Sequence, residues 1–297
     1  MMGEILVIGA TGHLGRRLTI KLLAHGYQVR AFVRNIEKAK NIGLPGVDLF
    51  EGDLREFETL EMAVKGVSFV INTSYIKYAD NVIRAIKEYG KGNVQQIIYV
   101  GSCGIYTNLH SKSANEKRNA EQIIKNSNLD YTIIRPTMIY GHAHDGNFSR
   151  LVKVARRFPV IPIIGNGQAK IQPVFIDDLV EILFNAIGNL HCYNDDFDIG
   201  GPEIMSCREL FRTVGSEFHK SVYLPSISSY ILKIIVKILN IIGKSPISIE
   251  QVDRFSEDKD VNNEKIARVL GGPVTGIKQG ILRLTEDMRR CNISKFN

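Results

Sequence analysis

The chain has 297 residues, and 44% of them are hydrophobic, which is enough for a sizeable core in one large domain or in a domain plus a lobe. The formal net charge is +7, but Lys and Arg are spread without a long basic run, so we expect no nucleic-acid partner. The 4 cysteines form no C-x-x-C pair, which argues against a zinc site and a disulfide framework. Only four residues precede the first apolar run and no run is long enough to span a bilayer, so we expect a cytoplasmic protein.

Residues 5–23 predict a strand, a glycine-rich turn and a helix. Gly9 permits a sharp exit from the strand, Gly12 allows close approach of a pyrophosphate, and Gly15 lets the helix pack against the sheet. The start of the helix would add free N–H groups and partial positive charge. A purely structural turn is the alternative, but the position between a strand and a helix favours dinucleotide binding.

The next strand, residues 27–34, ends in Arg34 and Asn35. A site that prefers NAD places Asp or Glu here for the ribose hydroxyls, whereas a guanidinium suits the 2′-phosphate. We therefore expect NADP(H) rather than NAD(H). Arg16 is either a second clamp for the phosphate or a solvated helix residue.

Further apolar runs at residues 47–54, 67–74 and 94–102 alternate with helical patterns, one of them at residues 77–89. This alternation predicts βαβ units and a parallel sheet that is covered on both faces, with ligands at the carboxyl ends of the strands. Asp53, at one such end, either meets the adenine edge of the cofactor or caps the following helix.

Seven motifs occur in order along the chain: GATGHLG, FVRN, EGDL, IIYVGS, LDYTIIRPTMIYG, PVFIDDL and FDIGGPE. In this combination the chain resembles the extended and atypical short-chain dehydrogenase/reductases, which are related to the NAD-dependent epimerases/dehydratases. Within them it is most similar to NmrA-like proteins and to the NADPH-binding accessory subunit of respiratory complex I. The resemblance implies a Rossmann-type doubly wound parallel sheet. It also implies that the cofactor lies against Gly9, Thr11, Gly12, His13, Leu14, Gly15, Arg34, Asp53, Leu54, Thr73, Ser74, Lys117, Arg135 and Pro136.

The same resemblance assigns the catalytic groups. Active members carry a Tyr four residues before a Lys, and a Ser after the fifth strand. Lys117 and Ser102 match the Lys and the Ser, but Ser113 stands at the tyrosine position, and its hydroxyl is a far weaker acid than a phenol. Three tyrosines near strand ends are either replacements for the missing phenol or packed aromatic residues: Tyr75, Tyr106 and Tyr140.

A polar loop that follows the strand end in LDYTIIRPTMIYG carries His142, His144 and Asp145. The spacing is like that of metal ligands, but a fourth ligand is missing, so we expect no metal. The alternatives are acid/base groups at the mouth of the substrate site and ordinary loop polarity.

We expect residues 1–146 to form the NAD(P)-binding Rossmann domain. Residues 147–297 would complete the sheet and form a smaller, mostly helical substrate lobe. Residues 161–187 predict a strand and then a helix whose start is marked by Asp177 and Asp178. Ser206 and Glu209 have the spacing of a capping box that opens another helix.

Residues 228–243 are almost wholly apolar, except for three polar residues on one helix face: Lys233, Lys237 and Asn240. One alternative is a core or homodimer-interface helix whose polar stripe faces water, and the other is peripheral membrane contact through this basic helix.

Two functions from different classes follow. The first is an NADPH-dependent oxidoreductase that reduces a carbonyl or an activated double bond of a small-molecule substrate. The second is a non-catalytic NADPH-binding protein that acts as a redox sensor, an assembly factor or a membrane-peripheral module for partner binding.

Overall fold

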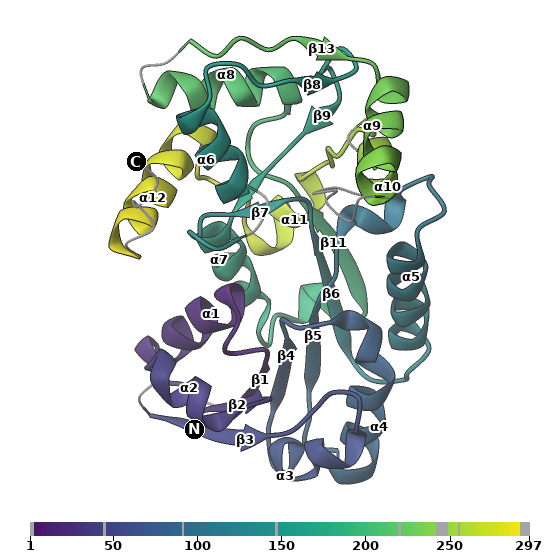
Figure 1. Ribbon diagram of the computed structural model, residues 1–297. Coiled ribbons are helices and arrows are strands. Elements are labelled where there is room, and N and C mark those ends of the chain that lie inside the picture. Colours follow the sequence, from purple (N-terminus) through teal and green to yellow (C-terminus); the bar gives the residue numbers. More distant parts are fainter. Residues whose placement is uncertain are drawn as a thin grey trace.

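The computed structural model describes residues 3–43, 46–90, 92–145, 148–218, 221–241, 249–254 and 256–291. Its centre is a seven-stranded parallel sheet in the order β11-β6-β5-β4-β1-β2-β3, and the lobe lies at the carboxyl ends of these strands (Figure 1). The strands are β1 (Ile5–Ile8), β2 (Val29–Val33), β3 (Val47–Glu51), β4 (Phe69–Asn72), β5 (Gln96–Val100), β6 (Tyr131–Pro136) and β11 (Asp195–Ile199). The predicted doubly wound parallel sheet is confirmed.

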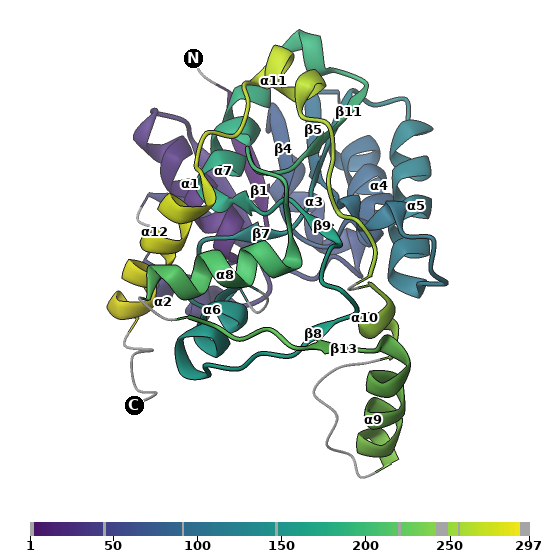
Figure 2. The same ribbon diagram turned by 90° about the horizontal axis from the view of Figure 1, so that it is seen from above.

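Helices cover both faces of the sheet, as Figure 2 shows. One face carries α1 (His13–Ala24), α2 (Ile36–Ile42), α7 (Ile176–Ala186) and α11 (Glu264–Leu270). The other carries α3 (Glu61–Val64), α4 (Ala79–Tyr89) and α5 (Lys112–Lys125). In β1 the side chains alternate between the two faces of the sheet, and both faces are covered, so all four residues are apolar. Ile5 and Val7 belong to the first core and Leu6 and Ile8 to the second, so every side chain of the strand is buried.

Chain order reverses at β1, which lies between β4 and β2. In such sheets the ligand crevice opens outside the carboxyl ends of the strands at this reversal. Short 3-10 helices follow three of the strands near this edge: η1 (Phe57–Leu60), η2 (Ile76–Tyr78) and η3 (Cys103–Tyr106). The loops after all these strands therefore meet at one edge of the sheet.

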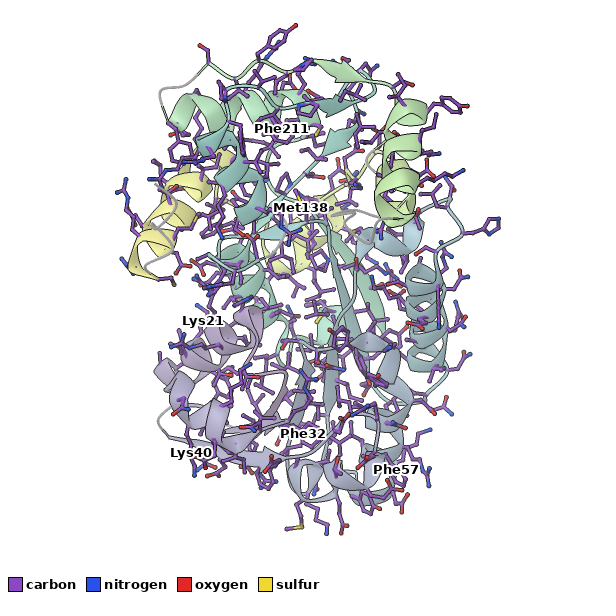
Figure 3. The ribbon with its side chains drawn as sticks, in the orientation of Figure 1. Lys21, Phe32, Lys40, Phe57, Met138 and Phe211 are labelled. Carbon is purple, nitrogen blue, oxygen red and sulfur yellow. The ribbon has the colours of Figure 1, made fainter. Side chains whose placement is uncertain are left out.

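The lobe has an apolar core of its own, built mainly by α6 (Phe148–Arg157), α8 (Cys207–Glu217) and α12 (Ile277–Arg290). Phe211 lies in the lobe, Phe32 lies in the sheet part, and Met138 lies where the two parts meet (Figure 3). Three pairs of two-residue strands complete the lobe: β7 (Ile139–Tyr140) with β10 (Val174–Phe175), β8 (Ile163–Ile164) with β13 (Ser226–Ile227), and β9 (Lys170–Ile171) with β12 (Met205–Ser206). The single strand that we expected within residues 161–175 is therefore wrong, since three short strands occupy this stretch.

The second half of the chain serves both parts, because α7, β11 and α11 return to the sheet after the lobe has begun. Arg17 of α1 donates to Asp177 of α7 at 2.7 Å, and Lys21 donates to Glu181 at 2.6 Å, so the two neighbouring helices are also joined by ion pairs. The predicted boundary falls at Gly146 and Asn147, which lie outside the described residues.

The capping box at the start of α8 is confirmed, since the Ser206 hydroxyl accepts from the Glu209 amide and the Glu209 carboxylate accepts from the Ser206 amide. The start of α7 differs from the prediction: the helix begins at Ile176, ahead of the expected Asp177. Asp178 instead accepts a 2.7 Å hydrogen bond from the Thr275 hydroxyl. A distant partner, rather than a local cap, uses this carboxylate.

The apolar helix α9 (Ser229–Ile241) lies at the edge of the molecule beside α10 (Ile249–Arg254), as Figure 2 shows. Its exposed residues include Tyr230, Ile231 and Ile234, at 72, 53 and 42% exposure. Lys233 forms an ion pair with Asp253 of α10 and is partly exposed, whereas Lys237 is exposed. The side chain of Asn240 and residues 242–243 lie outside the described part. Within that part, no helix is long and apolar enough to cross a membrane.

Candidate functional site

In the glycine turn after β1, a side chain at Gly9 or Gly15 would clash with the neighbouring chain. Gly9 has φ +86°, and a Cβ there would lie 2.9 Å from Thr73 Oγ1. The Gly12 amide donates to the Gly9 carbonyl at 2.9 Å, and a Cβ on Gly15 would lie 2.3 Å from that carbonyl oxygen. Thr73 Oγ1 donates to the Ile8 carbonyl at 2.9 Å, so this side chain supports the turn. The backbone around Gly12 is left exposed for a ligand.

Helix α1 begins at this turn without a partner for its first N–H groups. Gly12 is the N-cap, and among the described residues no side chain caps it, nor does the first turn hold an acidic residue. Leu14 points into the core, and His13 is exposed beside the turn. Unpaired N–H groups and the positive end of the helix dipole suit a pyrophosphate, so these residues fit the expected dinucleotide.

The ends of β2 and β3 carry the groups expected at the adenosine side. Arg34 is exposed, and its side chain makes no hydrogen bond or ion pair with any described residue. Asn35 caps α2 by accepting from the Lys38 amide at 2.7 Å. The guanidinium of Arg34 is therefore available to a phosphate.

Asp53 does not cap the next helical turn, whose N-cap is Glu56, so the capping alternative is wrong. Its carboxylate accepts from the Arg55 guanidinium at 2.6 and 3.0 Å and from the Arg55 amide at 2.9 Å. These bonds, with a smaller contribution from the charge of Arg34, lower the pKa of Asp53 to about 2. Leu54 is buried in the core, and its carbonyl accepts from the Asn81 side chain at 2.7 Å.

Ser74 follows β4 and adjoins the turn, since a Cβ on Gly9 would lie 3.1 Å from Ser74 Cβ. Its amide donates to the Asn72 side chain at 2.9 Å. Thr11, in the turn itself, is partly exposed. These residues therefore lie on the glycine turn or after the carboxyl ends of β2, β3 and β4, on the same edge of the sheet.

The Ser and Lys of the expected active site come together at Gly104 in η3. A Cβ on Gly104 would lie 3.1 Å from Ser102 Oγ and 3.9 Å from Lys117 Nζ. It would also lie 3.1 Å from an Nη atom of Arg254, which belongs to α10 of the lobe. Burial, and then the charge of Arg254, lower the pKa of Lys117. Arg254 was missed from the sequence, because nothing near it in the chain indicates that the lobe turns it toward η3.

Ser113 lies in the first turn of α5 and is exposed, one turn before the half-buried Lys117. The N-cap is Ser111, whose hydroxyl accepts from the Ala114 amide at 3.4 Å. The Ser102 hydroxyl accepts from the Gly104 amide at 3.1 Å, which leaves its proton available to another acceptor.

The three tyrosines differ in their surroundings. Tyr140 is 1% exposed, stacks on Phe148 at 4.4 Å between ring centroids, and has a hydroxyl without a hydrogen-bond partner among the described residues. The Tyr106 hydroxyl donates to the Asp198 carboxylate at 2.8 Å, and burial together with this carboxylate raises its pKa. Tyr75 is 66% exposed. This geometry favours the packed alternative for Tyr140 and a structural hydrogen bond for Tyr106.

Arg135, expected near the nicotinamide, lies in a buried ion network. Its guanidinium donates to Glu121 of α5 at 2.8 and 2.9 Å and forms ion pairs with Asp196 at 2.9 Å and Asp198 at 3.2 Å. The next residue, Pro136, ends β6 and is buried. This network joins α5 to the two outer strands and so fixes the helix that carries Lys117.

The histidines of the polar loop gather against the glycine turn. His142 stacks on His13 at 3.6 Å between ring centroids, and the His144 ring lies 5.5 Å from that of His142. Burial, followed by the neighbouring charge of His13, lowers the pKa of His142 to about 4. The Asp145 carboxylate accepts from the Ser149 amide at 2.7 Å. Within the described residues, no group of three His, Cys, Asp or Glu side chains could hold a metal ion.

Comparison with known proteins agrees with this geometry. Residues 9–156 match the model of a family described as NAD(P)H-binding. The chain is 25% identical over 245 residues to the Photosystem II assembly factor Ycf39 of Trieres chinensis, covering 79% of this chain and 75% of that protein. It is also 25% identical over 278 residues to the mitochondrial NADH-ubiquinone oxidoreductase 40 kDa subunit of Neurospora crassa, covering 87% and 72%.

Among solved structures, the NADPH-dependent quinone oxidoreductase QOR2 of Escherichia coli has the same fold. The TM-score is 0.76 at 20% identity, covering 95% of this chain and 99% of that one. The resemblance predicted from the seven motifs is confirmed.

Proposed function

Because residues 9–156 match a family described as NAD(P)H-binding and the chain resembles the short-chain dehydrogenase/reductases, we propose that it is an NADPH-dependent oxidoreductase acting on a small molecule. The group reduced is a carbonyl or an activated double bond. NADPH is preferred to NADH because the guanidinium of Arg34, which makes no hydrogen bond or ion pair with a described residue, lies at the end of β2, where an NAD-preferring site would have a carboxylate. When bound, the reduced nicotinamide supplies the hydride.

The observation that carries this proposal is the meeting of Ser102 and Lys117 at Gly104, beyond the carboxyl end of β5. The Ser102 hydroxyl already accepts from the Gly104 amide, so it is free to donate its proton to a substrate oxygen. Such a bond strengthens as negative charge develops on that oxygen, and it therefore stabilises the transition state more than the ground state. Lys117 holds the cofactor ribose and adds positive charge to the site.

The usual tyrosine position holds Ser113, so the proton that completes the reduction comes from another group. Ser113 is exposed, and its hydroxyl is a very weak acid, whereas Lys117 carries an ammonium whose pKa is lowered by burial and by Arg254. A lowered pKa makes that ammonium a better proton donor than an ordinary lysine. We therefore assign the proton to Lys117 or to water that it orients, and only a minor role to Ser113.

A second candidate function is a non-catalytic NADPH-binding module for protein partners. It is supported by the exposed apolar residues of α9 and by the names of two relatives, an assembly factor and a subunit of a respiratory complex. The absence of a tyrosine at Ser113 also agrees with it. In this reading NADPH stabilises the fold and no substrate is reduced.

The test is NADPH oxidation across a library of ketones, quinones and enones, with wild type, Lys117→Ala, Ser113→Ala and Ser113→Tyr. We expect Lys117→Ala to lower both cofactor affinity and turnover sharply. Ser113→Ala should cost less than about tenfold, since one ordinary hydrogen bond contributes about 1 kcal/mol. Ser113→Tyr should raise turnover if the geometry of the site is intact.

Two outcomes would count against these assignments. Loss of turnover in Ser113→Ala with normal turnover in Lys117→Ala would reverse the roles of the two residues. Tight NADPH binding without oxidation by any substrate would favour the binding module.

A further inference from the structure

Arg254, the last residue of α10, lies between two residues that tie this part of the chain to its neighbours. On one side Asp253 forms an ion pair with Lys233 of α9. On the other side the Glu257 carboxylate accepts from the Thr107 hydroxyl at 2.7 Å and from the Asn108 amide at 3.0 Å. Since Thr107 directly follows η3, the lobe is fastened to the loop that carries Ser102. The position of Arg254 is therefore part of the docked lobe.

Two cations from different parts of the chain meet at this point. Arg254 and Lys117 both lie within 4 Å of the position that a Cβ on Gly104 would take, at 3.1 and 3.9 Å. Neither side chain forms an ion pair with a carboxylate in the described ranges. The nearby Glu116 is shared with Lys77 at 3.9 Å, and Glu257 is bound as described above.

Burial, and then the charge of Arg254, lower the pKa of Lys117. Two half-buried like charges repel each other and lose hydration, so a bound anion would stabilise the pair. The cluster thus has the composition of an anion-binding site.

We infer that Arg254 binds an anionic group of the substrate, so that the substrate class is a small carboxylate or phosphate whose reducible group reaches Ser102. The role of this anion as a substrate rests on the proposed reductase function. Binding of an anion by Arg254 does not depend on that function. A guanidinium presents paired donors that match the oxygens of either anion. Neutral analogues of the same shape would leave Arg254 and Lys117 without a counter-charge and are therefore poor ligands.

The anion belongs to the substrate rather than to the cofactor because the two come from different parts of the chain. The expected phosphate sites of NADPH are the start of α1 and Arg34, both in the sheet part. Arg254 comes from the lobe, which covers the site from the opposite side. Binding of the cofactor should accordingly be independent of Arg254.

The test measures binding by calorimetry to protein loaded with NADP⁺, so that it does not depend on turnover. The probes are benzoate, phenyl phosphate and the neutral isostere benzamide. We expect both anions to bind wild type more tightly than benzamide, and Arg254→Ala to weaken them at least tenfold, which corresponds to one charge-assisted hydrogen bond. Arg254→Lys should recover part of the affinity. Arg212→Ala, which removes an exposed arginine of α8 in the same lobe, should change nothing.

Equal binding of benzoate and benzamide to wild type, or no binding of either anion, would overturn the inference. So would unchanged anion affinity in Arg254→Ala, or a tenfold loss of NADP⁺ affinity in that variant, which would assign the guanidinium to the cofactor. Failure of the proposed function has a different signature: NADPH oxidation is absent while benzoate binding still depends on Arg254.

Discussion

The buried ion pair between Arg135 and Glu121 tests whether Arg135 serves the fold or the cofactor. The two side chains are only 6 and 5% exposed, and the guanidinium donates to both carboxylate oxygens. Arg135→Met leaves the Glu121 carboxylate buried without its partner, and breaking such a pair costs about 3–5 kcal/mol. For a chain of 297 residues the entropy of unfolding is about 0.6 kcal/mol/K, so the melting temperature should fall by about 5–8 °C.

The assay is calorimetric unfolding of Arg135→Met, Glu121→Leu and the double variant, together with NADPH affinity for each. The double variant should be more stable than the sum of the single losses predicts, because neither partner is then left buried and charged. NADPH affinity should stay within about threefold of wild type, since Arg135 donates to three carboxylates of the chain. A well-folded Arg135→Met with a tenfold loss of NADPH affinity would refute this reasoning and place the guanidinium at the cofactor.

Two further predictions concern charge at the cofactor edge. Wild type should prefer NADPH to NADH by about tenfold to a hundredfold, and nearer tenfold because the Arg34 side chain is exposed. Arg34→Asp should narrow or reverse this preference. Calorimetry with both cofactors tests it, and equal affinities of wild type for the two would show that Arg34 plays no part. The second prediction concerns stability at acidic pH. The pKa of His142 is lowered from 6.5 to about 4, so between these pH values the unfolded chain takes up a proton that the folded chain does not. The free energy of unfolding should therefore decrease as the pH falls from 6.5 to 4. We expect the free energy of unfolding to fall by about 1–2 kcal/mol after allowance for solvent screening. In His142→Gln the urea midpoint should depend less on pH between 6.5 and 4. The same pH dependence in the variant and in wild type would contradict this.

The parts of the fold that could be predicted are those encoded over short stretches of sequence. The β1 strand is apolar at every position because both faces are covered, and the glycines that follow it are required by a positive φ at Gly9 and a close approach at Gly15. The capping box at Ser206 and Glu209 is equally local. Such signals do not depend on what packs against them.

The failures share a cause, which is a partner distant in the chain. Asp178 resembles a helix cap, but Thr275 binds it. Tyr140 stands near a strand end, where a side chain could reach the crevice, yet α12 covers it so closely that a Cβ on Gly280 would lie 2.0 Å from its hydroxyl oxygen. Periodicity shows which residues of a helix share a face, but not which face meets a neighbour, and α9 therefore has exposed isoleucines and a paired Lys233.

The candidate site likewise has one part that local sequence determines and one part that depends on residues distant in the chain. Its proposed cofactor side is made of strand ends and one helix start, so Gly12 and Arg34 could be named from the spacing of motifs. Its substrate side depends on how the lobe docks, and Arg254 reaches η3 only because α10 and the segment after it are fastened there. If the lobe supplies the charge that selects the substrate, then relatives that share the cofactor side need not share a substrate. A chain that lacks a tyrosine at Ser113 can then still be an enzyme, provided that Lys117 and Arg254 together stabilise the negative charge that hydride transfer places on the substrate.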